Sequence, residues 1–430
     1  MNGRKIAQNA IWIILCRIVQ SIISLVIGMM SARYLGPSNY GVINYAASIV
    51  AFAVPIMYLG INNILVQEII NNPDDEGKII GTSVTLSFFS AIACIAGVFA
   101  FTSIVNAGET ETIVVCLLYS LLMLFQSVDL IQYWFQAKLI SKYASVASLI
   151  AYICVAVYRL YLLFSRKNVY MFALSQMIDF LVIAAILYIV YSKLNGPKFE
   201  FSLGTAKRIF SKSRYYIVSS LMVTIFAQTD KIMLKLMLSE EAVGYYSAAV
   251  TCAGITAFVF AAIIDSFRPA IFETKKQDKE IYETNISRLY SIILYLSLFQ
   301  SLFMAIFSNE IIYILYGSQY APASSALQII VWYTTFAYLG SVRNIWILAE
   351  SKHKYLWIIN LAGALANILL NYICIPCWGI NGAAFASLIT QIFTNVIIGY
   401  IIRPISYNNK LMLKGLHLKY LYSFLKYLKK

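Results

Sequence analysis

The stretch SSLMVTIFAQTDKIMLKLMLSEEAVGYYSAA, residues 219–249, is apolar and long enough to cross a bilayer, yet it carries two lysines and an aspartate. On a helix, one face of this stretch is formed by Thr224, Gln228, Lys231 and Lys235. A charge near the centre of a membrane helix costs roughly 2.5–3.5 kcal/mol on insertion scales, so it usually faces a bundle interior or a hydrated cavity. The stretch therefore predicts a membrane helix with a functional polar face.

The composition of the whole chain points to the same class of protein. Hydrophobic residues make up 60% of the 430 positions and charged residues 12%, whereas soluble proteins have about 45–50% and about 25%. The net charge of +14 lies in the connections between apolar segments and in the tail, so we expect no nucleic-acid partner. The apolar run from Ile6 lacks a signal-peptidase site and is interpreted as an uncleaved first span.

Metal and enzyme chemistry find little support in the sequence. Cys374 and Cys377 form a CxxC pair, but no second pair follows it and the chain has only two histidines. No GxxxxGK, HExxH or GxSxG pattern occurs. We therefore predict a protein that is not an enzyme and that has no cofactor and no metal site.

Twelve apolar segments of membrane-spanning length can be placed along the chain. Their approximate bounds are 10–32, 41–62, 79–105, 112–132, 145–164, 169–191, 215–237, 243–265, 289–307, 325–347, 355–375 and 381–402. Nearly all Lys and Arg residues of the connections fall on one side, with Arg166 and Lys167 as the exceptions. The positive-inside rule then predicts that both termini are cytoplasmic.

The most basic connection, residues 193–214, lies near the middle of the chain and predicts a cytoplasmic linker between two six-helix lobes, 1–192 and 215–402. The tail, residues 403–430, intersperses Lys with Leu, Tyr and Phe, which favours an interfacial helix on anionic lipid over a disordered or partner-binding segment.

Two internal matches predict that the lobes are a duplication. Shifted by 203 residues, LGPSNYGVINYAA matches LSEEAVGYYSAA, and a shift of 212 lays Trp134 and Tyr143 on Trp346 and Tyr355. An even number of spans per half makes these parallel repeats.

The 203-residue shift places the polar stripe of the first span on that of the seventh, so that Arg17 and Lys231 occupy matching helix faces. These two cations are the leading candidates for a substrate site in a seam between the lobes, with Lys235 and Arg33 toward the external end. The alternative is that each cation reaches a lipid headgroup or pairs with an acid, with Asp230 as the partner of Lys231. Asp230 itself either supports the seam or titrates beside it.

Three further charges lie deep in apolar spans: Arg159, Asp179 and Arg343. Each either lines the transport cavity or forms a structural ion pair across helices, and the sequence does not pair them. Asp129 and Asp265 lie near inner helix ends, where interfacial hydration accounts for them.

Four motifs, in order along both halves, carry a resemblance to a known family. They are ARYLGPSNYGVINYAAS, QTDKIMLKLMLSEEAVGYYSAA, LYGSQYAPASSALQII and LAGALANILLNYICIPCWGINGAAFASLITQ. The chain resembles the Wzx-like polysaccharide flippases of the multidrug/oligosaccharidyl-lipid/polysaccharide exporter superfamily, which also contains the MATE transporters. The resemblance implies an all-α polytopic protein of the bacterial inner membrane, with two six-helix lobes in a V that alternate between inward-open and outward-open states.

The cargo implied by the resemblance is an undecaprenyl-diphosphate-linked oligosaccharide. Its diphosphate would bind cations such as Arg17, Lys231 and Arg343. Transport would be driven by a proton or sodium gradient, acting through Asp230 or Asp179, or by the membrane potential. The other implied partners are membrane lipids, a polysaccharide polymerase and a chain-length regulator.

Three rival functions fit the sequence less well. A MATE-type cation or drug antiporter would be expected to have an acid in the first span, which carries Arg17 instead. A polysaccharide polymerase or glycosyltransferase would need larger external loops, and a peptidoglycan-precursor flippase is expected to be a longer chain with extra helices.

Overall fold

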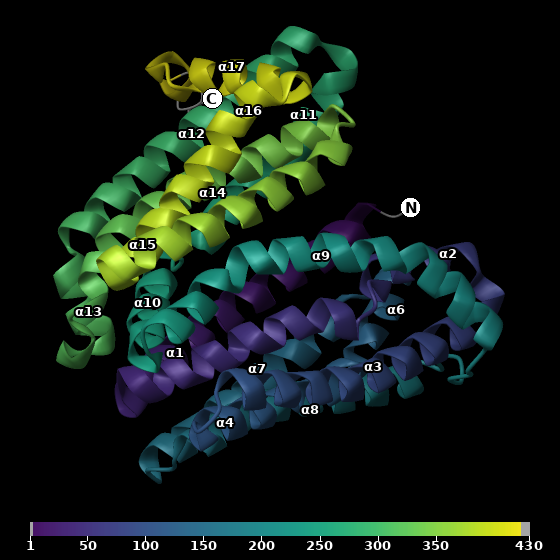
Figure 1. Cartoon of the computed structure of the whole chain (residues 1–430). Helices are drawn as coiled ribbons and strands as arrows, with labels where there is room; N and C mark the ends of the chain where they lie inside the picture. The colour runs from purple at the N-terminus through teal and green to yellow at the C-terminus, as the bar shows by residue number, and fades with distance from the viewer. Residues whose placement is uncertain (1–2, 423–430) are drawn as a thin grey trace. The chain divides into compact units, whose positions relative to one another are not determined.

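A computed structural model describes the backbone of residues 3–422 and the side chains from Cys16 onward, except that of Arg17. Every regular element in this part of the chain is a helix (Figure 1). The predicted all-α class is confirmed.

The chain divides into two compact units, Met1–Gln228 and Thr229–Lys430. The division falls inside the long helix α9, Leu203–Met237, so that the first part of α9 belongs to the first unit. The predicted lobes, 1–192 and 215–402, stay a prediction; the first unit differs from the first lobe because it includes this part of α9.

The first unit is built from nine helices and three short 3-10 turns within its described residues. They are α1 Gly3–Met57, η1 Ile61–Asn63, α2 Leu65–Asn71, η2 Pro73–Asp75, α3 Glu76–Val105, α4 Thr110–Ser120, α5 Leu122–Gln126, η3 Val128–Ile131, α6 Gln132–Ala137, α7 Lys142–Phe164, α8 Val169–Lys193 and the start of α9.

The second unit continues from the end of α9. Its elements are α10 Glu240–Ala253, α11 Ala257–Gln277, α12 Lys279–Ile306, α13 Ser308–Tyr316, η4 Ser318–Tyr320, α14 Ala323–Ala349, η5 His353–Tyr355, α15 Leu356–Ile392, the π-helical turn η6 Phe393–Ile397, α16 Ile398–Ile401, η7 Arg403–Ile405 and α17 Ser406–Gly415.

Two long helical runs contain a sharp break at a glycine. Gly36 in α1 (φ 74°) and Gly379 in α15 (φ 57°) have positive φ, which glycine adopts without the strain of a Cβ. The chain reverses at the second break. The close approach of its two arms shows this, since a Cβ added to Gly382 would lie only 2.1 Å from the carbonyl oxygen of Cys374. Eight residues of straight helix would separate these two positions by about 12 Å. Figure 1 shows α1 as two arms in the same way.

These reversals explain how few separate helices can contain so many spans. Among the described residues, eight helices are long and apolar enough to cross a membrane, and α10 with α11, bent by 44°, makes a ninth candidate. Two of the eight, Ile18–Met57 and His353–Ile401, contain the breaks and are twice the length of about 20 residues that one crossing needs. The predicted twelve spans are consistent with this arrangement.

The connection between α8 and α9 lies against the start of α3. The Glu200 N–H donates to the carbonyl of Gly77 (3.2 Å), and the Ser202 N–H donates to the Thr82 hydroxyl (3.0 Å). A side chain at Gly77 would collide with the backbone of this segment at 2.3 Å. The predicted linker 193–214 is therefore held to the first unit along part of its length.

The basic start of α9 is also bound to the first unit. Glu68 of α2, only 3% exposed, pairs with Lys212 (2.6 Å) and Arg208 (3.4 Å) of α9. Residues 203–214, which belong to the predicted linker, are thus the beginning of a helix, and a buried carboxylate neutralises part of their charge.

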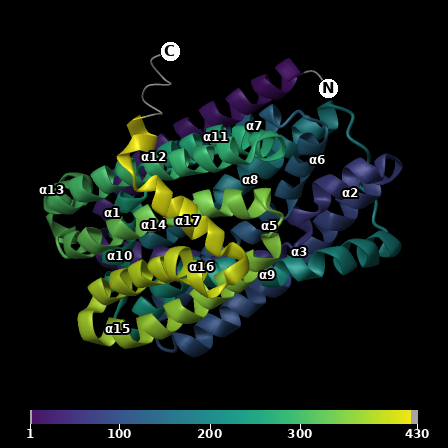
Figure 2. The ribbon, with the colours of Figure 1, turned by 90° about the horizontal axis from the view of Figure 1, so that it is seen from above.

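Helix α17 is a packed part of the second unit. Asn408, Asn409 and Leu411 are buried, Asn408 accepts a hydrogen bond from Tyr290 of α12 (2.9 Å), and α17 also packs against α16 (Figure 2). The prediction of an interfacial tail helix covers residues 403–430, of which 423–430 lie outside the described residues.

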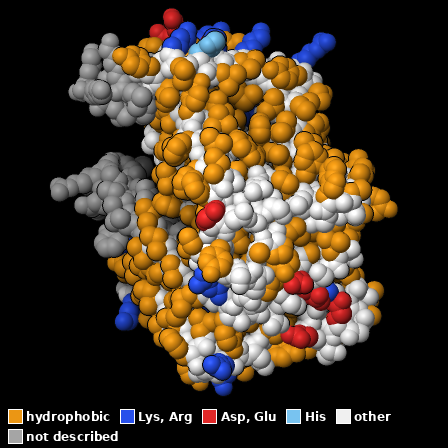
Figure 3. Space-filling model, turned by 90° about the vertical axis from the view of Figure 1, so that its left-hand side faces the viewer, with side chains coloured by type: hydrophobic (Ala, Val, Ile, Leu, Met, Phe, Trp, Pro, Cys, Tyr) orange, Lys and Arg blue, Asp and Glu red, His pale blue; other side chains and the backbone are white. Residues whose placement is uncertain are grey.

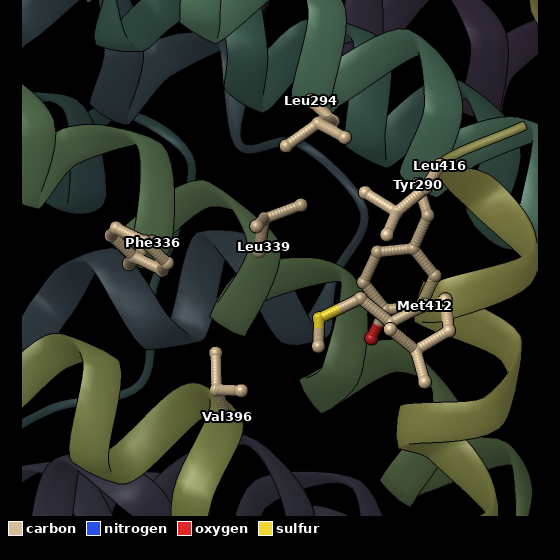
Figure 4. A pocket seen from close by; sticks show the side chains of 8 residues that line it. Tyr290, Leu294, Phe336, Leu339, Val396, Met412 and Leu416 are labelled. Carbon is tan, nitrogen blue, oxygen red and sulfur yellow. The ribbon is translucent and has the colours of Figure 1, made fainter. Parts of the chain in front are cut away.

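An apolar cavity of about 130 Å³ lies beside α17 (Figure 4). Tyr290 and Leu294 of α12, Leu339 of α14 and Met412 of α17 form part of its lining. Its wall continues into the apolar core of the second unit.

The surface is consistent with a lipid environment. Hydrophobic side chains cover much of the face drawn in Figure 3, while charged side chains gather in a few clusters. Large apolar side chains such as Phe164 (84% exposed) and Ile104 (78% exposed) extend outward from the helices.

Candidate functional site

Lys231 lies in α9, directly after the point where the second unit begins. Its side chain is half-buried, and its ammonium makes no hydrogen bond or ion pair with a described residue of its own unit. An ammonium in an apolar helix that forms no hydrogen bond or ion pair can bind an anion directly.

Asp230 does not form a hydrogen bond with Lys231. Its carboxylate, on a residue 8% exposed, accepts hydrogen bonds from Tyr246 Oη (2.5 Å), Asn371 Nδ2 (2.6 Å) and Ser387 Oγ. The pairing of Asp230 with Lys231, which the sequence left open, is thus replaced by three uncharged donors from α10 and the two arms of α15.

The residues around Asp230 were missed by the sequence argument. Asn367 and Asn371 are one helical turn apart in an apolar segment and bond to each other (3.1 Å), and Tyr246 also lies 3.3 Å from Ser387. The amide oxygen of Asn371 is buried and has no partner among the described residues. Two asparagines at this spacing in an apolar span were the signal that could have identified this cluster.

Lys235 is 7% exposed and forms an ion pair with Glu240 at the start of α10. Because its ammonium already has a carboxylate partner, Lys235 is a weaker candidate for substrate binding than Lys231. Arg33, the other cation predicted toward the external end, is exposed.

The two remaining residues of the polar stripe belong to the first unit. The Thr224 hydroxyl donates to the carbonyl of Ser220 in its own helix (3.1 Å), and the Gln228 amide oxygen accepts from Ser48 of α1 (3.1 Å). The predicted stripe is present on α9, and each of its described members except Lys231 has a partner.

Arg343 of α14 is 4% exposed. Its guanidinium donates to the carbonyl of Thr394, inside the π-helical turn η6, and weakly to Asn344 Oδ1 (3.4 Å). These contacts favour a structural role, in which Arg343 caps the carbonyl groups that the wider turn leaves open. Binding of substrate by Arg343 stays a prediction.

Arg159 of α7 and Asp179 of α8 come together at one cavity of about 50 Å³ inside the first unit. Other polar side chains of its wall are Ser24 of α1, Tyr152 of α7 and Gln176 of α8. Arg159 Nε donates to Ser175 Oγ (2.9 Å), but Arg159 and Asp179 form no ion pair with each other. The sequence left the pairing of these charges open, and the structure places these two in one cavity without a direct ion pair.

Arg17 lies in the first arm of α1, and its side chain is outside those that the structure describes. Its match to Lys231 stays a prediction. Metal binding was not expected, and within the described residues no group of three or more His, Cys, Asp or Glu side chains is placed to hold an ion.

A sequence model of the family described as "Polysaccharide biosynthesis protein" matches residues 6–275, more than half of the chain. The chain belongs to this family. The protein aligns over 89% of its length, at 21% identity, with 96% of the capsular polysaccharide biosynthesis protein CapF of Staphylococcus aureus.

A shorter alignment joins this polysaccharide biosynthesis protein to an archaeal relative. This chain is 23% identical, over 48% of its length, to the "Probable low-salt glycan biosynthesis flippase Agl15" of Haloferax volcanii. The alignment spans 43% of that relative's length.

Solved structures establish the fold. The lipid II flippase MurJ, in an inward closed conformation, superposes with a TM-score of 0.71 at 14% identity, covering 97% of this chain and 93% of MurJ. An inward-facing MATE family transporter of the MOP superfamily gives 0.70 at 13% identity, covering 91% and 96%. The protein is thus a polysaccharide biosynthesis protein with a MATE-like fold, as the sequence predicted.

Proposed function

We propose that the protein is a flippase that moves an undecaprenyl-diphosphate-linked oligosaccharide, the repeat unit of a polysaccharide, from the cytoplasmic to the outer leaflet of a bacterial inner membrane by alternating access. The family match over residues 6–275 carries this proposal, because it links the chain to polysaccharide biosynthesis. The MATE-like fold, shared with transporters, supports movement of a cargo rather than its synthesis.

Lys231 supports the diphosphate as the recognised group. Its half-buried ammonium forms no ion pair or hydrogen bond with a described residue of its own unit, so a diphosphate oxygen could bind it directly in a low-dielectric setting. Arg17 is the second proposed ligand of the diphosphate, because the 203-residue shift places it on the helix face that matches Lys231.

Asp230 is the proposed coupling group for H+ or Na+. Its carboxylate, with the free amide oxygen of Asn371 and the hydroxyl of Ser387, gathers oxygen atoms from three helical segments. Protonation or ion binding there would change hydrogen bonds that join these segments. Asp179 is less suited to this role, since Arg159 shares its cavity and would repel a cation.

The experiment that tests the proposal measures flipping in cells that lack the native protein and carry variants. Lys231→Ala and Arg17→Ala should each reduce surface polysaccharide at least about tenfold, as expected for loss of one charge-assisted contact to the cargo, while protein levels stay near normal. Lys354→Ala, which removes an exposed lysine, is the matched control. Full surface polysaccharide production by both variants would refute the role of the cations.

The same cells distinguish the flippase from a drug antiporter. Deletion of the protein should trap lipid-linked oligosaccharide on the cytoplasmic face of the membrane. Unchanged glycan export together with altered resistance to cationic dyes would instead support the antiporter.

A further inference from the structure

The proposed function assigns neither the diphosphate nor the coupling ion to the cavity at Arg159 and Asp179. It lies inside the first unit, where the first arm of α1 meets α7 and α8. One part of its wall is polar, through Ser24, Tyr152, Arg159, Gln176 and Asp179. The other part is aliphatic, through Ile23, Ile27, Val155 and Ala156.

Asp179 has hydrogen-bonding capacity that the protein leaves unused. The residue is 8% exposed, and its Oδ1 atom has no hydrogen-bond partner among the described residues. A buried carboxylate oxygen without a donor is unfavourable by about 1–3 kcal/mol or more. The atom can therefore accept a hydrogen bond from a ligand in the cavity.

Arg159 supplies the complementary group in the same cavity. Its Nε is held by Ser175 of α8, which fixes the guanidinium, and the terminal nitrogens make no ion pair with Asp179. The cavity thus presents a donor and an acceptor that are not paired with each other.

The charge of the cavity restricts what it can bind. A cation would be attracted by Asp179 but repelled by Arg159. An anion would be attracted by Arg159 but repelled by Asp179. The two charges together favour a neutral group that both donates and accepts a hydrogen bond.

The size and the aliphatic wall restrict it further. A cavity needs about 10–15 Å³ of volume for each water-sized atom that it holds. The cavity of about 50 Å³ therefore has room for about three or four non-hydrogen atoms. An acetamido group has four such atoms: its N–H can donate to Asp179, its carbonyl can accept from Arg159, and its methyl suits the aliphatic wall.

We infer that this cavity binds the acetamido group of an N-acetylated sugar in the cargo. The inference rests on the proposed function, since it names the sugar class that the flippase selects. Arg159 and Asp179 are then specificity residues, while Lys231 recognises the diphosphate that every lipid-linked cargo shares.

The test is a binding measurement on the purified full-length protein in lipid nanodiscs. The two probes are undecaprenyl-diphosphate-linked N-acetylglucosamine and undecaprenyl-diphosphate-linked glucose, which differ only in the acetamido group. We expect the native protein to bind the first probe at least about tenfold more tightly, as a buried hydrogen bond to a charged group would give.

The double variant Arg159→Met/Asp179→Leu removes both charges together, so that neither remains buried alone. It should bind the two probes equally, with the affinity of the native protein for the glucose probe. The conservative variant Asp179→Asn should show a reduced preference for the N-acetylglucosamine probe. It replaces the double variant in the test if the double variant does not fold. Asp75→Asn, which alters a partly exposed carboxylate of the same unit that is paired with Lys78 (3.0 Å), is the control and should keep the full preference.

Each outcome has a defined meaning. Equal binding of the probes by the native protein, or an unchanged preference in the double variant, would overturn the acetamido subsite. Loss of a sodium dependence in Asp179→Asn with an unchanged sugar preference would overturn it in favour of an ion site. If the native protein binds neither probe, the proposed function itself fails.

Discussion

Asp179 and Asp230 are both aspartates in membrane helices, and each is 8% exposed, yet their surroundings differ completely. Asp230, in the second unit, accepts hydrogen bonds from three donors on α10 and α15. Asp179, in the first unit, keeps one oxygen without a partner and shares a cavity with Arg159. Burial alone therefore does not tell the role of an intramembrane acid. A carboxylate whose oxygens all accept hydrogen bonds links helices, whereas a carboxylate with an unpartnered oxygen beside a cavity is available to a ligand.

The largest expected difference between the two acids is in their contribution to stability. Asp230→Asn turns three charge-assisted hydrogen bonds into neutral ones and places an amide donor among existing donors, which should lower the unfolding free energy by about 2–4 kcal/mol. Asp179→Asn should have a smaller effect, about 1 kcal/mol, because Oδ1 has no hydrogen-bond partner to lose and only the attraction between the carboxylate and Arg159 in the same cavity is removed. Thermal unfolding in detergent, followed by tryptophan fluorescence, measures both. Equal shifts in Tm would show that the two sites do not differ as described.

A smaller difference is expected for the tyrosines that accompany the two acids. Tyr246→Phe removes a donor to Asp230 in a residue that is 2% exposed and should destabilise by about 1–2 kcal/mol. Tyr152→Phe removes a hydroxyl at the wall of the Asp179 cavity and should stay within about 0.5 kcal/mol. The same unfolding experiment applies, and a stability loss in Tyr152→Phe as large as that in Tyr246→Phe would contradict the comparison.

The smallest expected effect tests why the Asp179 cavity is not a cation site. In Arg159→Met the Asp179 carboxylate would be the remaining charge of the described cavity wall. Sodium should then bind to it and stabilise the protein. Stabilisation at a concentration equal to Kd is about 0.4 kcal/mol, which should appear as a small rise in Tm when NaCl replaces choline chloride. The native protein should show no such rise at this site, and Asp179→Asn combined with Arg159→Met should lose it. A variant insensitive to sodium would show that Arg159 is not what excludes the ion.

The structure also bears on the predicted duplication. Leu139 and Ser351, which are 212 positions apart, both have positive φ, at 59° and 54°. Their amides donate to Gln136 (3.1 Å) and Leu348 (3.0 Å), which are also 212 apart. The same helix-ending turn thus follows the tryptophan of each matching segment. The duplication stays a prediction, and this correspondence supports it.

Several features of the candidate site could be predicted and others could not. The unpaired cation Lys231 was found because a lysine in an apolar span is unusual whatever its neighbours are. The partners of Asp230 were not found, because Tyr246, Asn371 and Ser387 are up to 157 residues away and none is charged. The cavity at Asp179 was missed for a similar reason, since α1, α7 and α8 meet there only in the folded unit.

The sequence by itself determined the class of protein, the approximate positions of its spans and the family. Hydropathy and local motifs are properties of short stretches, and the hydropathy of a stretch decides whether it can cross a bilayer. Only the tertiary structure decided which intramembrane charges are satisfied. Whether a carboxylate has donors depends on which helix faces pack against it, and an apolar helix carries little information about its neighbours beyond the spacing of its few polar residues. Asp179 and Asp230 look alike in the sequence, and packing alone separates them.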